Sequence, residues 1–140
     1  MTVFFVDEVW AKVGERTCLN CHNVDGDASA SRFLLRDTAR TRSKRAAAMR
    51  HNQLAFQRVA AAQEEGTSRL LQKIRGDLDH GGGEVLKADS TGYRILERFV
   101  RRTSGNPDKG PAISNYDAKP FFDGILTGQR QVFLCCVFKS

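Results

Sequence analysis

The sequence predicts an all-α fold for residues 1–103. Apolar residues recur at helical spacing in several segments, alternation of the strand type is nearly absent, and Gly, Ser or Asp stand where helices would begin or end. With 140 residues, 41% of them hydrophobic, the chain is long enough for one domain with a modest core.

The opening segment is predicted to be a helix with one apolar face. Its apolar residues fall at i, i+3, i+4 and i+7: Val6, Val9, Trp10 and Val13. Gly14 is expected to end or kink this helix and so to turn Cys18 toward a prosthetic group. A short helix is expected over residues 29–35, and the basic residues after it are expected to form an exposed connection.

Residues 46–65 are predicted to form a second long helix, because the segment is rich in alanine and lacks Gly and Pro. Gly66 is expected to end it. One stripe of this helix is apolar and contains Met49, Phe56, Val59 and Ala60.

Two shorter helices complete the predicted domain. Residues 68–76 are expected to begin with a cap at Thr67 or Ser68 and to end at Gly76. After a loop, the last helix over residues 91–102 is capped by Asp89 or Ser90. Tyr93, Leu96 and Val100 share one side of this helix, and Ile95 and Phe99 share the neighbouring one.

The composition changes after residue 103. Residues 104–116 are rich in Gly, Pro, Ser and Asn and are predicted to be a linker. Residues 117–140 are interpreted as a fragment of a following segment, too short to bury its own apolar residues. No function is assigned to Cys135 and Cys136.

Charge and hydropathy narrow the function classes. The longest nearly uncharged run, "QVFLCCVF", is shorter than the roughly 20 residues of a membrane-spanning helix, and the first residues lack the pattern of a secretory signal. The net charge of +6 and the pI of about 9.5 favour an acidic partner. Residues 36–50 carry much of this charge, but they have no aromatic residues to stack on bases, which disfavours nucleic acid.

The segment "TCLNCHN" at residues 17–23 contains the attachment pattern of c-type haem, Cys18-x-x-Cys21-His22. Two thiols one helical turn apart can each form a thioether with a haem vinyl group, while the adjacent imidazole becomes the proximal iron ligand. A thioredoxin-like centre would need a βαβ context, and a zinc site would need a second pair of ligands. Chance occurrence of the pattern is the remaining alternative.

A protein ligand on the other face of the iron would be His80, Met49 or His51, the other histidines and the internal methionine. Three glycines follow His80, so the backbone there could pass close to a flat ring; the alternative is an ordinary surface turn. Met49 is more typical of core packing, and His51 of an exposed histidine. Ligation by two histidines would give a lower potential than methionine opposite histidine.

Several motifs in order resemble one known family. An aromatic helix precedes "CLNCH" and is followed by "TSRLLQKIRG", "HGGGEVL" and "DSTGYRILERFVRR". In this order they resemble the planctomycete-type cytochrome c domains that head large multidomain bacterial proteins, over residues 4–102. The resemblance implies a small class I-like cytochrome c fold around one covalently bound haem c, with thioethers at Cys18 and Cys21, His22 as proximal ligand and His80 as distal ligand. As in other small c cytochromes, the first and last helices are then expected to cross and to form the core from Phe5, Val9 and Trp10 against Leu96, Phe99 and Val100. The resemblance also implies an extracytoplasmic location and fusion to further domains.

We therefore expect an electron-transfer module that carries single electrons and docks an acidic redox partner. Lys73, Arg69 or Arg75 are candidates to neutralise the haem propionates, or they form a solvated helix face. No general acid and base pair stands out, so the domain is not expected to be an enzyme. The alternatives are a haem-based sensor with an open or displaceable distal site, and a non-haem interaction domain in which the CxxCH pattern is accidental.

Overall fold

The computed structural model describes residues 1–40 and 42–105. The chain divides into two units, Met1–Gly110 and Pro111–Ser140. Ser104 and Gly105 form a turn after the last helix. The rest of the predicted linker, the tail, and Cys135 and Cys136 lie outside the described residues.

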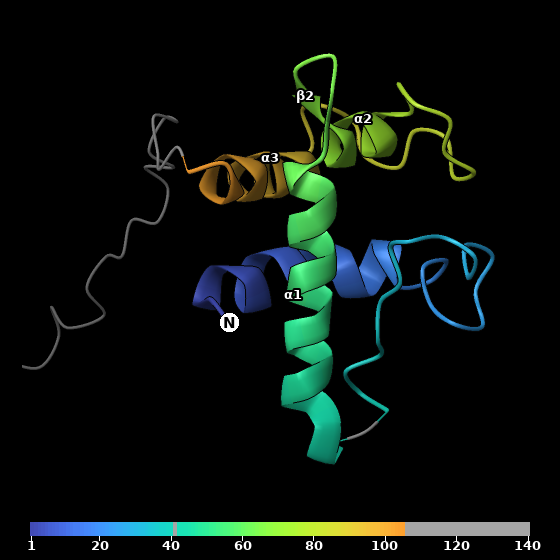
Figure 1. Cartoon of the computed structure of the whole chain (residues 1–140), viewed down its shortest axis with the longest axis vertical. Coiled ribbons are helices and arrows are strands. Elements are labelled where there is room, and N and C mark those ends of the chain that lie inside the picture. Colours follow the sequence, from blue (N-terminus) through green and yellow to red (C-terminus); the bar gives the residue numbers. More distant parts are fainter. Residues whose placement is uncertain (41, 106–140) are drawn as a thin grey trace, which may run out of the picture. The chain divides into compact units, whose positions relative to one another are not determined.

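The described residues are mostly helical, as predicted. The elements are η1 (Phe5–Cys18), η2 (Arg42–Lys44), α1 (Arg45–Ala61), β1 (Gln63–Glu64), β2 (Thr67–Ser68), α2 (Arg69–Arg75) and α3 (Thr91–Thr103). The long helix α1 crosses both η1 and α3 (Figure 1). The two short strands form an antiparallel hairpin in which Gln63 pairs with Ser68 and Glu64 with Thr67, a feature that the all-α prediction did not include.

Helix η1 continues through Gly14 to Cys18, so the prediction that Gly14 ends it is wrong, while a kink at Gly14 stays a prediction. Its hydrogen bonding is of the π type, and at its end the N–H of Leu19 donates to the carbonyl of Gly14 at 2.8 Å. A Cβ at residue 14 would stand 2.8 Å from Cε3 of Trp10. Glycine is therefore needed because the indole lies against the backbone here. Val9, Trp10 and Val13 are buried, as their spacing predicted.

Residues 29–35 form turns and extended backbone, so the predicted short helix is wrong. The physical reason is that the chain bonds to neighbouring elements. The Asn52 side chain accepts from the Arg36 N–H and donates to the Arg36 carbonyl, both at 2.8 Å. The Trp10 indole N–H donates to the Thr38 hydroxyl at 3.3 Å. These bonds hold the segment in an extended form between α1 and η1.

Helix α1 ends at Ala61, before Gly66, so the predicted boundary is also wrong. Glu65 and Gly66 have positive φ angles of 52° and 77°, the requirement of a two-residue type I′ hairpin turn. Gly66 thus serves the hairpin rather than the end of the helix. The apolar stripe is confirmed, since Met49, Phe56 and Ala60 are buried.

The termini of α2 and α3 follow local sequence signals. Ser68 precedes α2, but its hydroxyl donates to the carbonyl of Ala60 at 2.9 Å and does not cap the helix. Gly76 ends α2 in the left-handed conformation, as predicted. Ser90 caps α3, because its hydroxyl oxygen accepts from the N–H of Tyr93 at 3.2 Å.

Three aromatic rings from three helices form the centre of the core. Phe5 of η1 lies 5.6 Å from Phe56 of α1 and 5.8 Å from Phe99 of α3, and Phe56 lies 6.2 Å from Phe99, all between ring centroids. The expected packing of the first helix on the last is confirmed, with α1 as the third member. Among the described residues no helix has the length and apolar character needed to cross a membrane.

Candidate functional site

The CxxCH motif lies at the C-terminal end of η1. Cys18 is the last residue of that helix, and the chain turns so that the N–H of His22 donates to the Cys18 carbonyl at 3.0 Å. Cys18 and Cys21 are free thiols, Cys18 partly buried and Cys21 exposed. Burial, with a smaller contribution from the negative charge of Cys21, raises the pKa of Cys18 to about 12. A reactive redox thiol would need a lowered pKa.

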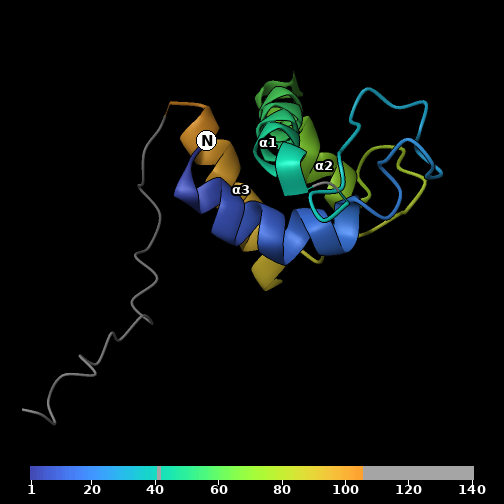
Figure 2. The ribbon, with the colours of Figure 1, turned by 90° about the horizontal axis from the view of Figure 1, so that it is seen from below.

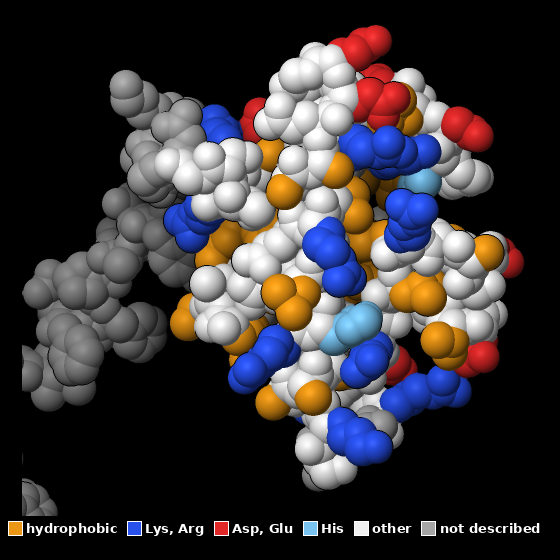
Figure 3. Space-filling model, viewed as in Figure 1, with side chains coloured by type: hydrophobic (Ala, Val, Ile, Leu, Met, Phe, Trp, Pro, Cys, Tyr) orange, Lys and Arg blue, Asp and Glu red, His pale blue; other side chains and the backbone are white. Residues whose placement is uncertain are grey.

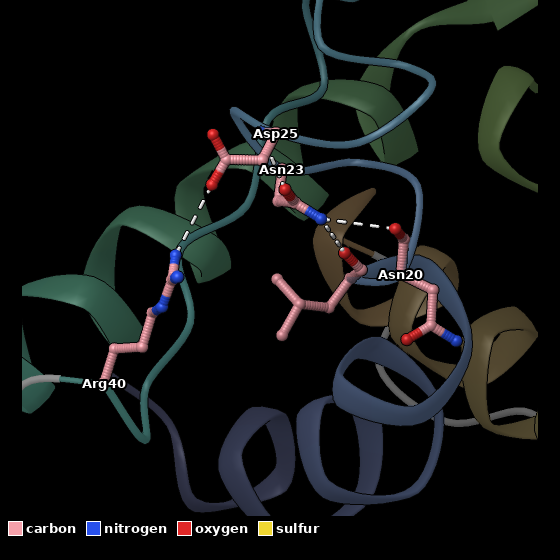
Figure 4. Close-up of polar contacts among 5 residues, drawn as sticks. Asn20, Asn23, Asp25 and Arg40 are labelled. Atoms are coloured by element: carbon pink, nitrogen blue, oxygen red, sulfur yellow. Dashed lines mark hydrogen bonds and ion pairs between the residues drawn. The ribbon is translucent and has the colours of Figure 1, made fainter.

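The loop that follows the motif is held by its own side chains (Figure 4). The amide of Asn23 donates to the carbonyls of Leu19 at 2.7 Å and Asn20 at 3.2 Å, and Arg40 pairs with Asp25 at 3.5 Å. Gly26 lies so close to the motif that a Cβ there would be 2.3 Å from the Cys21 carbonyl oxygen. The loop backbone is therefore packed directly on the CxxCH turn.

His22 is held by two residues of the extended segment. Its Nδ1 lies 3.2 Å from the Ser31 hydroxyl oxygen, which donates to the Phe33 carbonyl at 3.2 Å. The Phe33 ring packs on the imidazole edge-to-face, with centroids 4.9 Å apart. Burial lowers the pKa of His22, repulsion from His80 lowers it further, and the Phe33 carbonyl opposes both. The imidazole is therefore neutral at pH 7, the form in which histidine binds metals.

The structure brings His80 next to His22. The two ring centroids are 6.0 Å apart and the ring planes differ by 11°. His80 lies in the loop between α2 and α3, which extends on the same side of the helices as the loop after the CxxCH motif (Figures 1 and 2). Two residues that are 58 positions apart in sequence thus meet across two loops.

Backbone bonds close the loop that carries His80. The carbonyl of Ile74 accepts from the N–H groups of Val85 at 2.9 Å and Leu86 at 3.0 Å. Within the loop, Nδ1 of His80 lies 3.4 Å from the Gly83 carbonyl oxygen. A Cβ at Gly82 would lie 3.3 Å from Cγ2 of Val85 and 3.5 Å from the His80 ring. Gly83 has a positive φ angle of 61°, which favours glycine at that position of the turn.

The other candidate ligands have structural surroundings. Met49 is buried in the hydrophobic core, at 3% exposure. The prediction that His51 is an exposed histidine is wrong: it is half-buried, and its Nε2 lies 3.0 Å from the Leu34 carbonyl oxygen. That bond helps to hold the extended segment on α1. The ring that faces His22 belongs to His80.

The three cations proposed for haem propionates all have protein partners. The Lys73 ammonium donates to the carbonyl of Asp79, the residue before His80. Arg69 pairs with Glu64 at 3.2 Å, and Arg75 with Asp77 at 3.3 Å. Exposed pairs of this kind contribute little stability. Lys73 therefore tethers the His80 loop to α2, and its role toward a propionate stays a prediction.

One distance agrees with a metal held by two imidazoles. With metal–nitrogen bonds of about 2.0 Å, two imidazoles that bind one ion from opposite sides have centroids roughly 6 Å apart. The His22 and His80 centroids are 6.0 Å apart. Both Nδ1 atoms lie near oxygen atoms, so Nε2 is the nitrogen of each ring that has no hydrogen-bond partner among the described residues. In the described part of the chain, no group of three or more His, Cys, Asp or Glu residues could hold a metal ion.

Sequence reasoning missed three residues of this region. Gly26, Ser31 and Asn52 each fix the CxxCH turn or the segment beside it. Asn52 had a detectable signal, because it lies four residues from both Ala48 and Phe56 on the apolar face of α1. A polar residue on such a face needs a hydrogen-bonding partner.

Comparisons of the chain with protein-family models, with curated proteins and with solved structures found no match.

Proposed function

We propose that residues 1–103 bind one haem c covalently and carry single electrons. The observation that carries the proposal is the placement of the His80 ring 6.0 Å from the ring of His22, the residue that follows Cys21, with the ring planes 11° apart. Iron in haem, when bound, supplies the one-electron chemistry. The resemblance to planctomycete-type cytochrome c domains and the contact of the first helix with the last are consistent with a class I-like cytochrome c fold.

Each residue of the motif has a defined role in this proposal. Cys18 and Cys21 would hold the haem covalently by addition of each S–H across one vinyl group, in which the S–H and vinyl π bonds break and one S–C and one C–H bond form. His22, whose pKa is lowered by burial, would supply a neutral imidazole to the iron. His80 would supply the second imidazole. Phe33 covers one edge of the His22 ring and limits its rotation.

An acidic redox partner is part of the same proposal. Residues 38–63 contain six Lys or Arg residues and no Asp or Glu, and cations spread over the face that α1 crosses (Figure 3). We define the basic stripe as the exposed residues Arg50, Leu54 and Arg58, at i, i+4 and i+8 of α1, with Lys44 and Arg45 at its start. Cations at a helix N-terminus oppose the helix dipole, so anions of a partner would stabilise them.

The stripe also has the surface character of a docking site. Leu54 at its centre is 51% exposed. A shallow depression of about 410 Å³ lies beside it, lined by Ala46, Ala47, Arg50, His51 and Leu54. His51 contacts the carbonyl of Leu34, the neighbour of Phe33, which packs on His22. A partner bound to the stripe would therefore stand close to the segment that packs on the proximal histidine.

A haem-based sensor is the second candidate function, and one observation favours it. The His80 Nδ1 lies 3.4 Å from its acceptor, longer than an ordinary hydrogen bond, and three glycines follow it. A histidine held so weakly could be displaced by a small molecule. Absorption spectra of the reduced protein with and without carbon monoxide separate the two functions, because a firmly bis-ligated iron does not bind carbon monoxide.

The deciding experiment is a pyridine haemochrome assay on the full chain produced with a c-type maturation system. We expect one haem per chain, which stays attached after denaturation. His80→Ala should convert low-spin iron to high-spin. His51→Gln, which keeps a side-chain donor for the Leu34 carbonyl, is the control and should leave the iron low-spin. A compact, cooperatively unfolding protein without haem would refute the proposal and would favour the interaction domain with an accidental motif.

The basic stripe has its own test. The oxidation rate of the reduced protein is measured with anionic hexacyanoferrate(III) and with cationic hexaammineruthenium(III). We expect the anionic oxidant to react faster at low salt and to slow as salt increases. Arg50→Glu with Arg58→Glu should remove most of this salt dependence, whereas Arg94→Glu on α3 should not. Equal effects of the two changes would refute a localised stripe.

A further inference from the structure

A short hydrogen-bonded chain connects His22 to the backbone through Ser31. Nδ1 of His22 lies 3.2 Å from the Ser31 hydroxyl oxygen, and the same hydroxyl lies 3.2 Å from the Phe33 carbonyl oxygen. Ser31 is half-buried in the turn that ends the loop after the CxxCH motif. The three groups lie in the order imidazole, hydroxyl, carbonyl.

The order of these groups fixes the direction of both bonds. A serine hydroxyl has one hydrogen, and a carbonyl oxygen can only accept. The Ser31 hydrogen is therefore donated to the Phe33 carbonyl, and the hydroxyl oxygen is left to accept from His22. The hydrogen of the neutral imidazole must then be on Nδ1, and Nε2 carries the free electron pair.

We propose that Ser31 is a positioning residue that fixes the tautomer and the ring orientation of His22. It keeps the hydrogen on Nδ1 and leaves Nε2 free to bind a metal. This inference rests on the proposed function only for the identity of that metal as haem iron, because the tautomer is a property of the protein alone.

The position of Ser31 has a consequence for the redox potential. A hydrogen bond from a ligating imidazole to an acceptor makes the imidazole a stronger donor. A stronger donor stabilises the oxidised iron more than the reduced iron and lowers the midpoint potential. Removal of the Ser31 hydroxyl should therefore raise the potential. The corresponding contact of His80, from Nδ1 to the Gly83 carbonyl oxygen, is longer, at 3.4 Å.

Three variants of the full chain, made with the maturation system, test the proposal. Ser31→Ala removes the hydroxyl acceptor and leaves the Phe33 carbonyl, which also raises the pKa of His22. Ser31→Thr retains a hydroxyl, and Ser29→Ala makes the same change at an exposed serine of the same loop. We expect Ser31→Ala to raise the midpoint potential and to change the anisotropy of the electron paramagnetic resonance signal of the oxidised protein. Ser31→Thr should restore both values, and Ser29→Ala should match the parent.

The outcomes separate this inference from the proposed function. If Ser31→Ala leaves the midpoint potential and the electron paramagnetic resonance signal of the holoprotein unchanged, the role of Ser31 is overturned and the proposed function stands. If the parent chain carries no haem but is folded, the ¹⁵N chemical shifts of the imidazole decide: a Nδ1–H tautomer that becomes mixed in Ser31→Ala supports the inference, and no change overturns it. A colourless and unfolded parent chain would overturn both proposals.

Discussion

The two histidines that face each other are held in contrasting ways. The surroundings of His22 are fixed by side chains from several elements: Asn23 on the loop, Ser31 and Phe33 on the extended segment, and Asn52 on α1. The His80 loop is fixed mainly by backbone bonds, with Lys73 as its side-chain tether. The contrast indicates one rigid ligand, held by side-chain packing, and one adjustable ligand, carried by a glycine-rich turn.

Among the changes that test this contrast, Asn52→Ala is expected to have the largest effect on stability. The change leaves the N–H and carbonyl of Arg36 without their partner, next to a side chain that is fully buried. We expect a loss of about 3 kcal/mol in the free energy of unfolding, measured with urea. Asn20→Ala, which removes an exposed bond to the Arg16 carbonyl, is the control and should cost under about 0.5 kcal/mol. Equal costs would show that Asn52 is not what holds the extended segment.

A pair of glycine substitutions compares the two loops directly. Gly26→Ala places a Cβ 2.3 Å from the Cys21 carbonyl oxygen and should cost about 1–3 kcal/mol while lowering the yield of holoprotein. A Cβ at residue 81 would have no atom within 4 Å, so Gly81→Ala should change the free energy of unfolding by no more than about 0.5 kcal/mol. Thermal unfolding and haem content measure both. If Gly81→Ala lowers stability and haem content as much as Gly26→Ala does, the His80 loop is not adjustable.

Lys73→Met should loosen the His80 loop, because it removes the bond from the Lys73 ammonium to the Asp79 carbonyl. Since that bond is exposed, the free energy of unfolding should fall by less than about 1 kcal/mol. Hydrogen exchange should become faster for the amides of residues 77–84 and stay unchanged for residues 19–35. Lys87→Met is the matched control on an exposed lysine that follows the loop. Faster exchange in both loops would mean that the two are mechanically coupled.

The smallest expected effect is a pH dependence of the haem-free protein. The pKa of His22 is lowered on folding from its ordinary value of 6.5, so below pH 6.5 the unfolded chain binds more protons than the folded one. The contribution of His22 to stability is therefore present above pH 6.5 and is lost as the pH falls below it. Urea unfolding between pH 7.5 and 4.5 should show a free energy of unfolding that falls as the pH falls. This pH dependence should be weaker in His22→Gln and unchanged in His51→Gln.

Sequence reasoning succeeded where local signals decide the structure. The spacing of Val9, Trp10 and Val13 predicted the buried face of η1, and Gly76 and Ser90 marked the boundaries of α2 and α3. It failed where partners distant in sequence decide. Residues 29–35 have acceptable helix formers, but His51 and Asn52 bind their backbone and that of Arg36 in an extended form. Gly66 was assigned to a helix end because the hairpin turn that needs its positive φ angle was not expected.

The candidate site shows the same division. The CxxCH spacing specified three of its residues, and the glycines after His80 suggested the fourth. Their meeting could not be predicted from periodicity, because it depends on two loops that extend from the same side of the helices. Ser31 gave no signal in the sequence, since a serine in a polar loop is ordinary. Its hydrogen bond to His22 exists only after the loop has folded back.

The double use of the Ile74 carbonyl has a practical consequence. Because the N–H groups of Val85 and Leu86 both end on that one oxygen, the C-terminal end of the His80 loop is fastened to the last turn of α2 at a single atom. We expect residues 77–84 to accept other sequences more readily than the fastened residues do. Exchange of this loop would then vary the group opposite His22 while α2 and α3 are retained.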